Sequence, residues 1–84
     1  SIGPLARMTN DFLLSVVVPA FNEQEVLAAF HRRLASVLAK IDARAEVIYV
    51  NDGSDDLTLE VMRTLQSDDG RVGIIDLSRN FGKE

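Results

Sequence analysis

The sequence predicts an α/β protein: a β-α-β-α-β unit that forms half of an open parallel sheet and leaves that sheet incomplete. Apolar, β-branched runs stop twice at polar, turn-forming clusters, at residues 19–23 and 51–56, and apolar residues at helical spacing follow each cluster. A third apolar run follows the second helical pattern, at residues 72–77. Strands joined by helices lie parallel in one sheet because such crossovers are right-handed in nearly every case.

The first strand is predicted over residues 13–18 and is expected to be buried on both faces, because its apolar run is nearly continuous. Pro19 is expected to end the strand, since proline cannot donate to a ladder. Asn22 and Glu25 have the spacing of a helix cap and its returning carboxylate, which predicts a helix over residues 23–40. The apolar residues of this helix share one face: Leu27, Phe30, Leu34, Val37, Leu38 and Ile41.

The second strand is predicted over residues 45–50, the second helix over 56–66 and the third strand over 72–77, where Gly73 weakens the pattern. Residues 78–84 are then the loop that leaves this strand. Two helices cannot cover both faces of a parallel sheet, so we expect residues 13–84 to be the first part of a longer domain. We also expect self-association through the uncovered sheet edge or the apolar faces. Residues 1–12 form an extension, and the sequence leaves open whether Met8 is the native start and residues 1–7 are an expression tag.

Composition excludes several classes of function. At 84 residues the chain is one small domain, and its 46% hydrophobic content is ordinary for a globular protein. A formal net charge of -4 with scattered basic residues argues against a nucleic-acid partner. The chain has no cysteine, so a disulfide or thiolate metal site is impossible. Its longest apolar run, residues 12–18, is far shorter than the roughly 20 residues that span a bilayer.

The ends of the first two predicted strands carry the candidate site. The carboxyl ends of parallel strands meet at one edge of a sheet, where ligands of open α/β folds bind. Taken singly, a proline after a strand, a capping asparagine and an Asp-Gly-Ser turn are more often structural than functional. Acidic residues at two neighbouring strand ends repel one another, however, and this cost indicates that a ligand or metal offsets it.

Each candidate residue has a side chain suited to part of a nucleoside diphosphate. The acceptor-only carboxylate of Asp52 suits the N–H of a uracil or the donor edge of a guanine, and Phe21 offers a flat face for stacking. Further candidates are Asn22 and Glu23 for ribose hydroxyls, and Arg79 and Lys83 for the diphosphate. No G-x-G-x-x-G or G-K-[ST] pattern follows the first strand, which disfavours a dehydrogenase-type dinucleotide site and a P-loop.

Three motifs, VVVPAFNE at residues 16–23, VNDGSDD at 50–56 and LSRNFGKE at 77–84, resemble the amino-terminal third of inverting, family 2 type glycosyltransferases with the Rossmann-like GT-A fold. The last motif is most similar to the branch of dolichol-phosphate mannose synthase and the undecaprenyl-phosphate sugar transferases. The resemblance covers residues 13–84. It implies a UDP- or GDP-sugar donor, with contacts to base and ribose at Pro19, Phe21, Glu23 and Asp52, and donor phosphates near residues 79–83. Phe21 stands where a tyrosine is common.

The resemblance also implies features that this sequence does not contain. Family members hold Mg2+ or Mn2+ with an Asp-x-Asp motif after a fourth strand, and the catalytic residues are expected beyond Glu84. The acids Asp68 and Asp69 lie in a loop before the third strand and are not a substitute. Asn51 stands where many members have an aspartate. We therefore expect the 84-residue chain to bind no metal and to be inactive, and the full-length enzyme to act on a polyprenyl phosphate at the cytoplasmic face of a membrane.

Two other classes remain as alternatives. A non-enzymatic regulatory or metal-binding α/β module, similar to a receiver domain, would carry paired acids at the end of its first strand, where this sequence has Glu23 alone. A nucleotidyltransferase would open with a glycine- and arginine-rich loop, which is missing. The remaining polar candidate, His31, is expected to be an exposed helical residue, whereas Tyr49 and Met62 are expected in the core.

Overall fold

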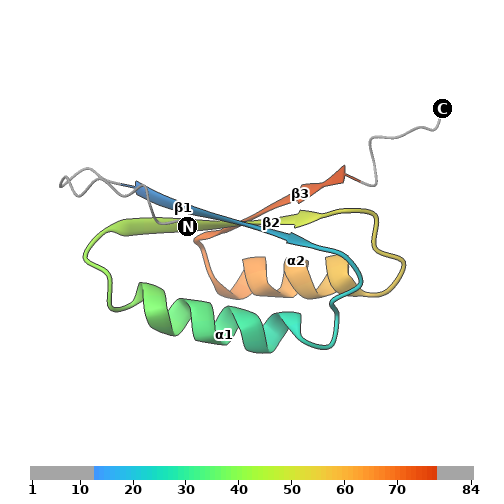
Figure 1. Cartoon of the computed structure of the whole chain (residues 1–84), viewed down its shortest axis with the longest axis horizontal. Coiled ribbons are helices and arrows are strands. Elements are labelled where there is room, and N and C mark those ends of the chain that lie inside the picture. The colour runs from blue at the N-terminus through green and yellow to red at the C-terminus, as the bar shows by residue number, and fades with distance from the viewer. Residues whose placement is uncertain (1–12, 78–84) are drawn as a thin grey trace.

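The computed structural model describes residues 13–77 and shows the predicted α/β unit (Figure 1). The elements follow one another as β1 (Leu13–Ala20), α1 (Leu27–Leu38), β2 (Arg44–Asn51), α2 (Thr58–Asp68) and β3 (Val72–Asp76). The three strands form one parallel sheet in the order β1-β2-β3. The register places Ala20 opposite Asn51 and Asn51 opposite Asp76, so the carboxyl ends of all three strands lie side by side.

Both helices cover the same face of the sheet (Figure 1). This arrangement follows from the strand order, because each right-handed crossover moves the chain one strand further in the same direction. The core lies between this face and the helices, and Tyr49 and Met62 are both fully buried in it, as predicted. Its other buried apolar members are Ala20, Leu27, Leu38, Val47 and Val72.

The opposite face of the sheet carries no helix from the described part of the chain (Figure 1). Exposure alternates along β1, so the expectation of a strand buried on both faces is wrong for residues 13–77. Val17 is 61% exposed and Ile75 is 47% exposed on this face. The register aligns Val17 with Ile48, and Val50 lies between Pro19 and Ile75. We call this surface the open sheet face.

Pro19 does not end the first strand. It lies inside β1, opposite Val50. Among the described strands β1 is an edge strand, where the missing N–H of proline costs no ladder hydrogen bond on the outer side. The second strand likewise extends one residue beyond the prediction at each end, while β3 ends one residue earlier.

The helix boundaries also differ from the prediction. The first helix begins at Leu27 instead of residue 23, and Asn22 is not its cap. The preceding turn is held by the carbonyl of Glu23, which accepts the N–H groups of Val26 and Leu27 at 3.1 and 3.0 Å. The second helix begins at Thr58 instead of residue 56. Before α1, Asn22 is used in contacts between loops, which local capping rules do not consider. Before α2, Asp56 accepts the N–H of Thr58 at 2.9 Å as well as a contact from the first loop.

His31 is buried, with 6% of its surface exposed, so the expectation of an exposed helical histidine is wrong. Its Nδ1 lies 2.6 Å from the Tyr49 hydroxyl and its Nε2 lies 3.0 Å from a carboxylate oxygen of Asp69. A carboxylate can only accept, so in the neutral imidazole Nε2 carries the proton and Nδ1 accepts from the Tyr49 O–H. Arg71 donates twice to the same carboxylate, from Nε and Nη2 at 3.0 and 2.8 Å. This His31–Tyr49–Asp69 network ties α1 to β2 and to the start of β3.

The network perturbs two pKa values. Burial, followed by the charge of Asp69, raises the pKa of Tyr49 to about 12. Hydrogen bonds from Arg71, with a smaller contribution from His31, hold the pKa of Asp69 well below its usual range despite partial burial.

Neither of the helices described in residues 13–77 is long and apolar enough to cross a membrane.

Candidate functional site

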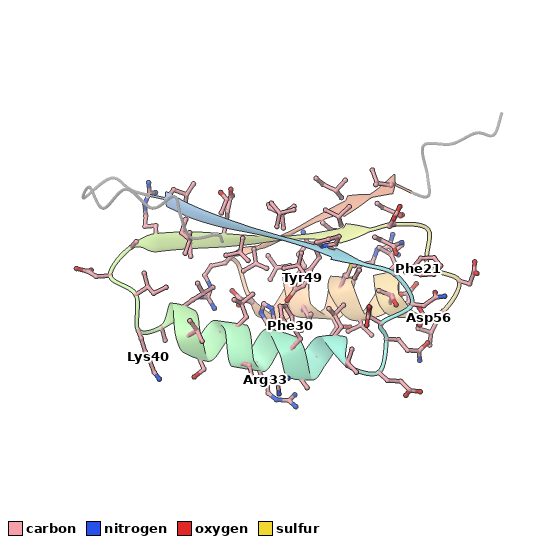
Figure 2. The ribbon with its side chains drawn as sticks, in the orientation of Figure 1. Phe21, Phe30, Arg33, Lys40, Tyr49 and Asp56 are labelled. Carbon is pink, nitrogen blue, oxygen red and sulfur yellow. The ribbon has the colours of Figure 1, made fainter. Side chains whose placement is uncertain are left out.

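The two predicted site loops lie next to each other at the carboxyl edge of the sheet. The first loop, residues 21–26, follows β1, and the second, residues 52–57, follows β2. Because Ala20 pairs with Asn51, both loops leave the sheet from adjacent positions. The N–H of Asp52 donates to the carbonyl of Ala20 at 3.1 Å, which places Asp52 beside the residue that precedes Phe21. Figure 2 shows Phe21 and Asp56 at this same end of the molecule.

Asn22 links the first loop to the second. Its backbone N–H donates to Ser54 Oγ at 2.9 Å, and its side-chain Oδ1 accepts the N–H of Asp55 at 2.7 Å. Its φ of 54° is in the left-handed region, which asparagine tolerates better than most residues. The side-chain oxygen of Asn22 is therefore engaged in holding the loops together, not in capping α1.

A second set of contacts lies deeper between the loops. The N–H of Glu23 donates to Thr58 Oγ1 at 2.8 Å, and Thr58 is fully buried. Gln24 exchanges two contacts with the second loop, donating its N–H to Asp56 at 3.4 Å and accepting the N–H of Leu57 at 2.9 Å. The two loops thus behave as one hydrogen-bonded unit, because contacts run in both directions along their length.

Asn51 links the second loop to the end of β3. Its Oδ1 accepts the N–H of Ser54 at 3.2 Å, and its Nδ2 donates to Asp76 Oδ1 at 3.0 Å. Asn51 is only 1% exposed. The sequence reasoning did not select Asp76, although it follows the apolar run 72–75 directly, as Asn51 follows the run that ends at Val50. A polar residue at the end of the third predicted strand was the signal that could have identified it.

Three of the side chains predicted to bind a ligand are exposed beside this framework, whereas a fourth, Asn22, is part of it. Phe21 is 52% exposed, a high value for a large apolar side chain at a loop surface. Glu23 and Asp52 are exposed as well. The loops therefore present an aromatic face and several carboxylates to solvent, among them Glu23 and Asp52, while contacts of Asn22 and of Thr58 at the start of α2 hold the loops together.

The site is a shelf with shallow hollows rather than an enclosed pocket in the described part of the chain. One hollow is lined by residues 22–26 together with Asp56. A second is lined by residues 18–20 of β1 and by Glu23, Val26, Leu27 and Phe30. A larger hollow than these two lies at the opposite edge, where residues 43–46 and 70–73 begin β2 and β3, and it contains none of the predicted site residues. We place the site at the carboxyl edge because the exposed functional side chains are there.

The structure thus brings together Phe21, Asn22, Glu23 and Asp52, with Pro19 at the end of β1 lining the second hollow. The other two predicted residues, Arg79 and Lys83, lie outside the described residues. Within residues 13–77, no group of three or more acidic or histidine side chains has the arrangement to hold a metal ion. The carboxylate of Asp69 is engaged by Arg71 and His31.

Comparison with known proteins decides the family. A model described as glycosyl transferase family 2 matches residues 15–84. The chain belongs to glycosyl transferase family 2. This agrees with the resemblance of the three sequence motifs and with the parallel sheet of Figure 1.

Several curated relatives have the same character. An uncharacterised glycosyltransferase of Bacillus subtilis, YkcC, is 40% identical over 77 residues, which cover 92% of this chain and 24% of the relative. An uncharacterised glycosyltransferase of Synechocystis, sll0501, is 42% identical over 84% of this chain and 22% of its own length. A bactoprenol glucosyl transferase of Shigella phage SfV is 35% identical over 84% of this chain and 23% of its own length. The family 2 chain described here therefore spans about a quarter of the length of these relatives.

Proposed function

We propose that this chain is the nucleotide-sugar-binding portion of a glycosyltransferase, which moves a sugar from a UDP- or GDP-sugar to an acceptor. One observation carries the proposal: the hydrogen bond from Asp52 to Ala20, with the loop contacts around it, sets the exposed Phe21 and Asp52 at one edge of the sheet. Phe21 stacks on the base, and the carboxylate of Asp52 accepts a hydrogen bond from a base N–H. Glu23 accepts hydrogen bonds from the ribose hydroxyls, while Arg79 and Lys83 bind the diphosphate.

The acceptor we propose is a polyprenyl phosphate, and the full-length enzyme works at the cytoplasmic face of a membrane. The support is the group of relatives that are named bactoprenol glucosyl transferases. Such a phosphate oxygen is already ionised near neutral pH, so it needs no general base from this part of the enzyme. The 84-residue chain by itself binds the donor without turning it over. Residues 13–77 contain no group of three or more acidic or histidine side chains arranged to hold a metal ion, so we propose that the Mg2+ or Mn2+ of the full-length enzyme is held mainly by residues outside this range.

Nucleotide titration tests this function directly. We expect UDP or GDP, but not CMP, to shift the backbone amide signals of Phe21, Glu23 and Asp52 selectively. Asp52→Asn removes the charged acceptor, and Phe21→Ala removes a stacking face worth about 1–3 kcal/mol per base. Each substitution should raise the dissociation constant by roughly tenfold or more.

Asp42→Asn is the matched control, because Asp42 is an exposed aspartate in the loop at the other end of α1. It should bind like the unmodified protein. Equal shifts with every nucleotide, or shifts that leave the two loops unaffected, would refute a donor site. Shifts with Mg2+ alone at the acidic loops, and none with a nucleotide, would instead favour a regulatory metal-binding module.

A further inference from the structure

The side chain of Asn51 occupies a position in which only an amide satisfies both of its partners. The Ser54 N–H can only donate, so it requires an acceptor, and Asn51 Oδ1 accepts from it at 3.2 Å. Oδ1 of Asp76 is the acceptor of the second contact, and Asn51 Nδ2 donates to it at 3.0 Å. The orientation of the amide is therefore fixed by its neighbours.

This side chain connects the end of β3 to both site loops. Asn51 directly precedes Asp52, and its second partner Ser54 accepts the backbone N–H of Asn22 through Oγ at 2.9 Å. A continuous series of hydrogen bonds thus leads from Asp76 through Asn51 and Ser54 to Asn22, next to Phe21. Because Asn51 is 1% exposed, water does not readily replace the two bonds that its side chain makes, whereas the bond between Asn22 and Ser54 is exposed.

We propose that Asp76 is a positioning residue of the nucleotide site: its carboxylate orients Asn51, which in turn sets the loop that carries Asp52. The proposal deepens the function proposed above and rests on it for its binding readout. It also gives a physical reason for the amide at position 51, where many family members have an aspartate. With Asp76 beside it, a carboxylate at that position would bring two negative charges within about 3 Å of each other.

A reciprocal exchange of the two side chains tests this pairing. Asn51→Asp alone should raise the dissociation constant of the bound nucleotide by roughly tenfold, because repulsion from Asp76 displaces the loop. In the double variant N51D/D76N, the new carboxylate accepts both from Ser54 N–H and from the new amide. We therefore expect the double variant to bind within about threefold of the unmodified protein.

The measurements separate positioning from a general loss of stability. Binding of UDP and GDP is measured by calorimetry on all variants, urea unfolding is measured alongside, and the amide signals of Ser54, Asp52 and Asn22 are followed. Asp76→Asn is the milder second variant if N51D does not fold, because its carbonyl still accepts from Asn51, and it should weaken binding only a few-fold.

The outcomes distinguish this proposal from the proposed function. If N51D binds nucleotide like the unmodified protein, or if D76N does not improve binding in the N51D background, Asp76 does not position the site. If the unmodified protein binds neither nucleotide, the donor site is lost. In that case the amide signals decide: displacement of the Ser54 and Asp52 signals in N51D and their return in the double variant support positioning of the loop by Asp76. Unchanged signals overturn it.

Discussion

The buried bond between Tyr49 and His31 offers a sharp test of what holds the helices to the sheet. In the unmodified protein, His31 Nδ1 accepts from the Tyr49 hydroxyl at 2.6 Å. Tyr49→Phe removes the hydroxyl oxygen and leaves Nδ1 without a donor. Both side chains are nearly inaccessible, at 0% and 6% exposure, so water does not replace the lost donor. Leaving a buried acceptor unpaired costs about 1–3 kcal/mol. For a domain of this size, each kcal/mol lowers the melting temperature by about 4–8 °C.

Urea unfolding followed by circular dichroism measures the effect. We expect Tyr49→Phe to lower the free energy of unfolding by about 1–3 kcal/mol, and His31→Leu to lower it further, because His31 also donates to Asp69. The double variant should lose less than the sum, with a coupling energy of at least about 0.5 kcal/mol. Arg32→Ala, on the exposed side of the same helix, is the control. If Tyr49→Phe stays within about 0.5 kcal/mol of the unmodified protein, as surface substitutions do, the network does not support the fold.

Four further predictions follow from the same structure. Tyr49 is the sole tyrosine of the chain, and its pKa is raised to about 12, so its near-ultraviolet absorbance should report ionisation near pH 12 in the folded protein and near pH 10 in urea. The contribution of protonated Tyr49 to the free energy of unfolding is fully present below pH 10 and is lost as the pH rises toward 12, at no more than about 1.4 kcal/mol per pH unit. Ionisation of Tyr49 near pH 10 in the folded protein would contradict this. Asp69 has a lowered pKa, so its stabilising effect is present above about pH 4 and is lost in stronger acid; Asp69→Asn should flatten the acid limb of an unfolding profile. Thr58→Val should cost about 1–3 kcal/mol, since it removes the acceptor for the Glu23 N–H, whereas Thr58→Ser should keep that bond, and equal losses would argue against it. Val17 is 61% exposed on the open sheet face, through which we propose that the 84-residue chain self-associates. Val17→Lys should reduce this self-association, as measured by sedimentation. An unmodified protein that is monomeric at high concentration would refute the proposal.

Much of the architecture was predictable because it depends on local patterns. The order of strands and helices, their parallel arrangement and the placement of Phe21 and Asp52 at one sheet edge all follow from apolar periodicity and crossover handedness. Some of the predictions that were wrong concern residues whose partners are distant in the sequence. Asn22 has the spacing of a helix cap, but it bonds instead to Ser54 and Asp55, more than 30 positions away.

His31 was missed in the core for a different reason. It lies four residues after Leu27 and seven before Leu38, the other buried residues of α1, so helical spacing was a local signal of burial that the prediction did not use. Its burial becomes favourable only because Tyr49 and Asp69 supply a donor and an acceptor from other elements. Asp76 was missed for a related reason: a single acid after a strand acquires a role only when the register sets it beside Asn51.

The sequence by itself therefore determined which segments are strands and helices, the family motifs, and the edge at which the acidic and aromatic residues gather. Those properties depend on side-chain type and short-range spacing. The tertiary structure alone decided that both helices lie on one face, that the loops are joined by Asn22 and Thr58, and that Asn51 pairs with Asp76. Hydrogen bonds between distant segments form only where the packed sheet fixes their distance and direction, and no local pattern encodes those two quantities.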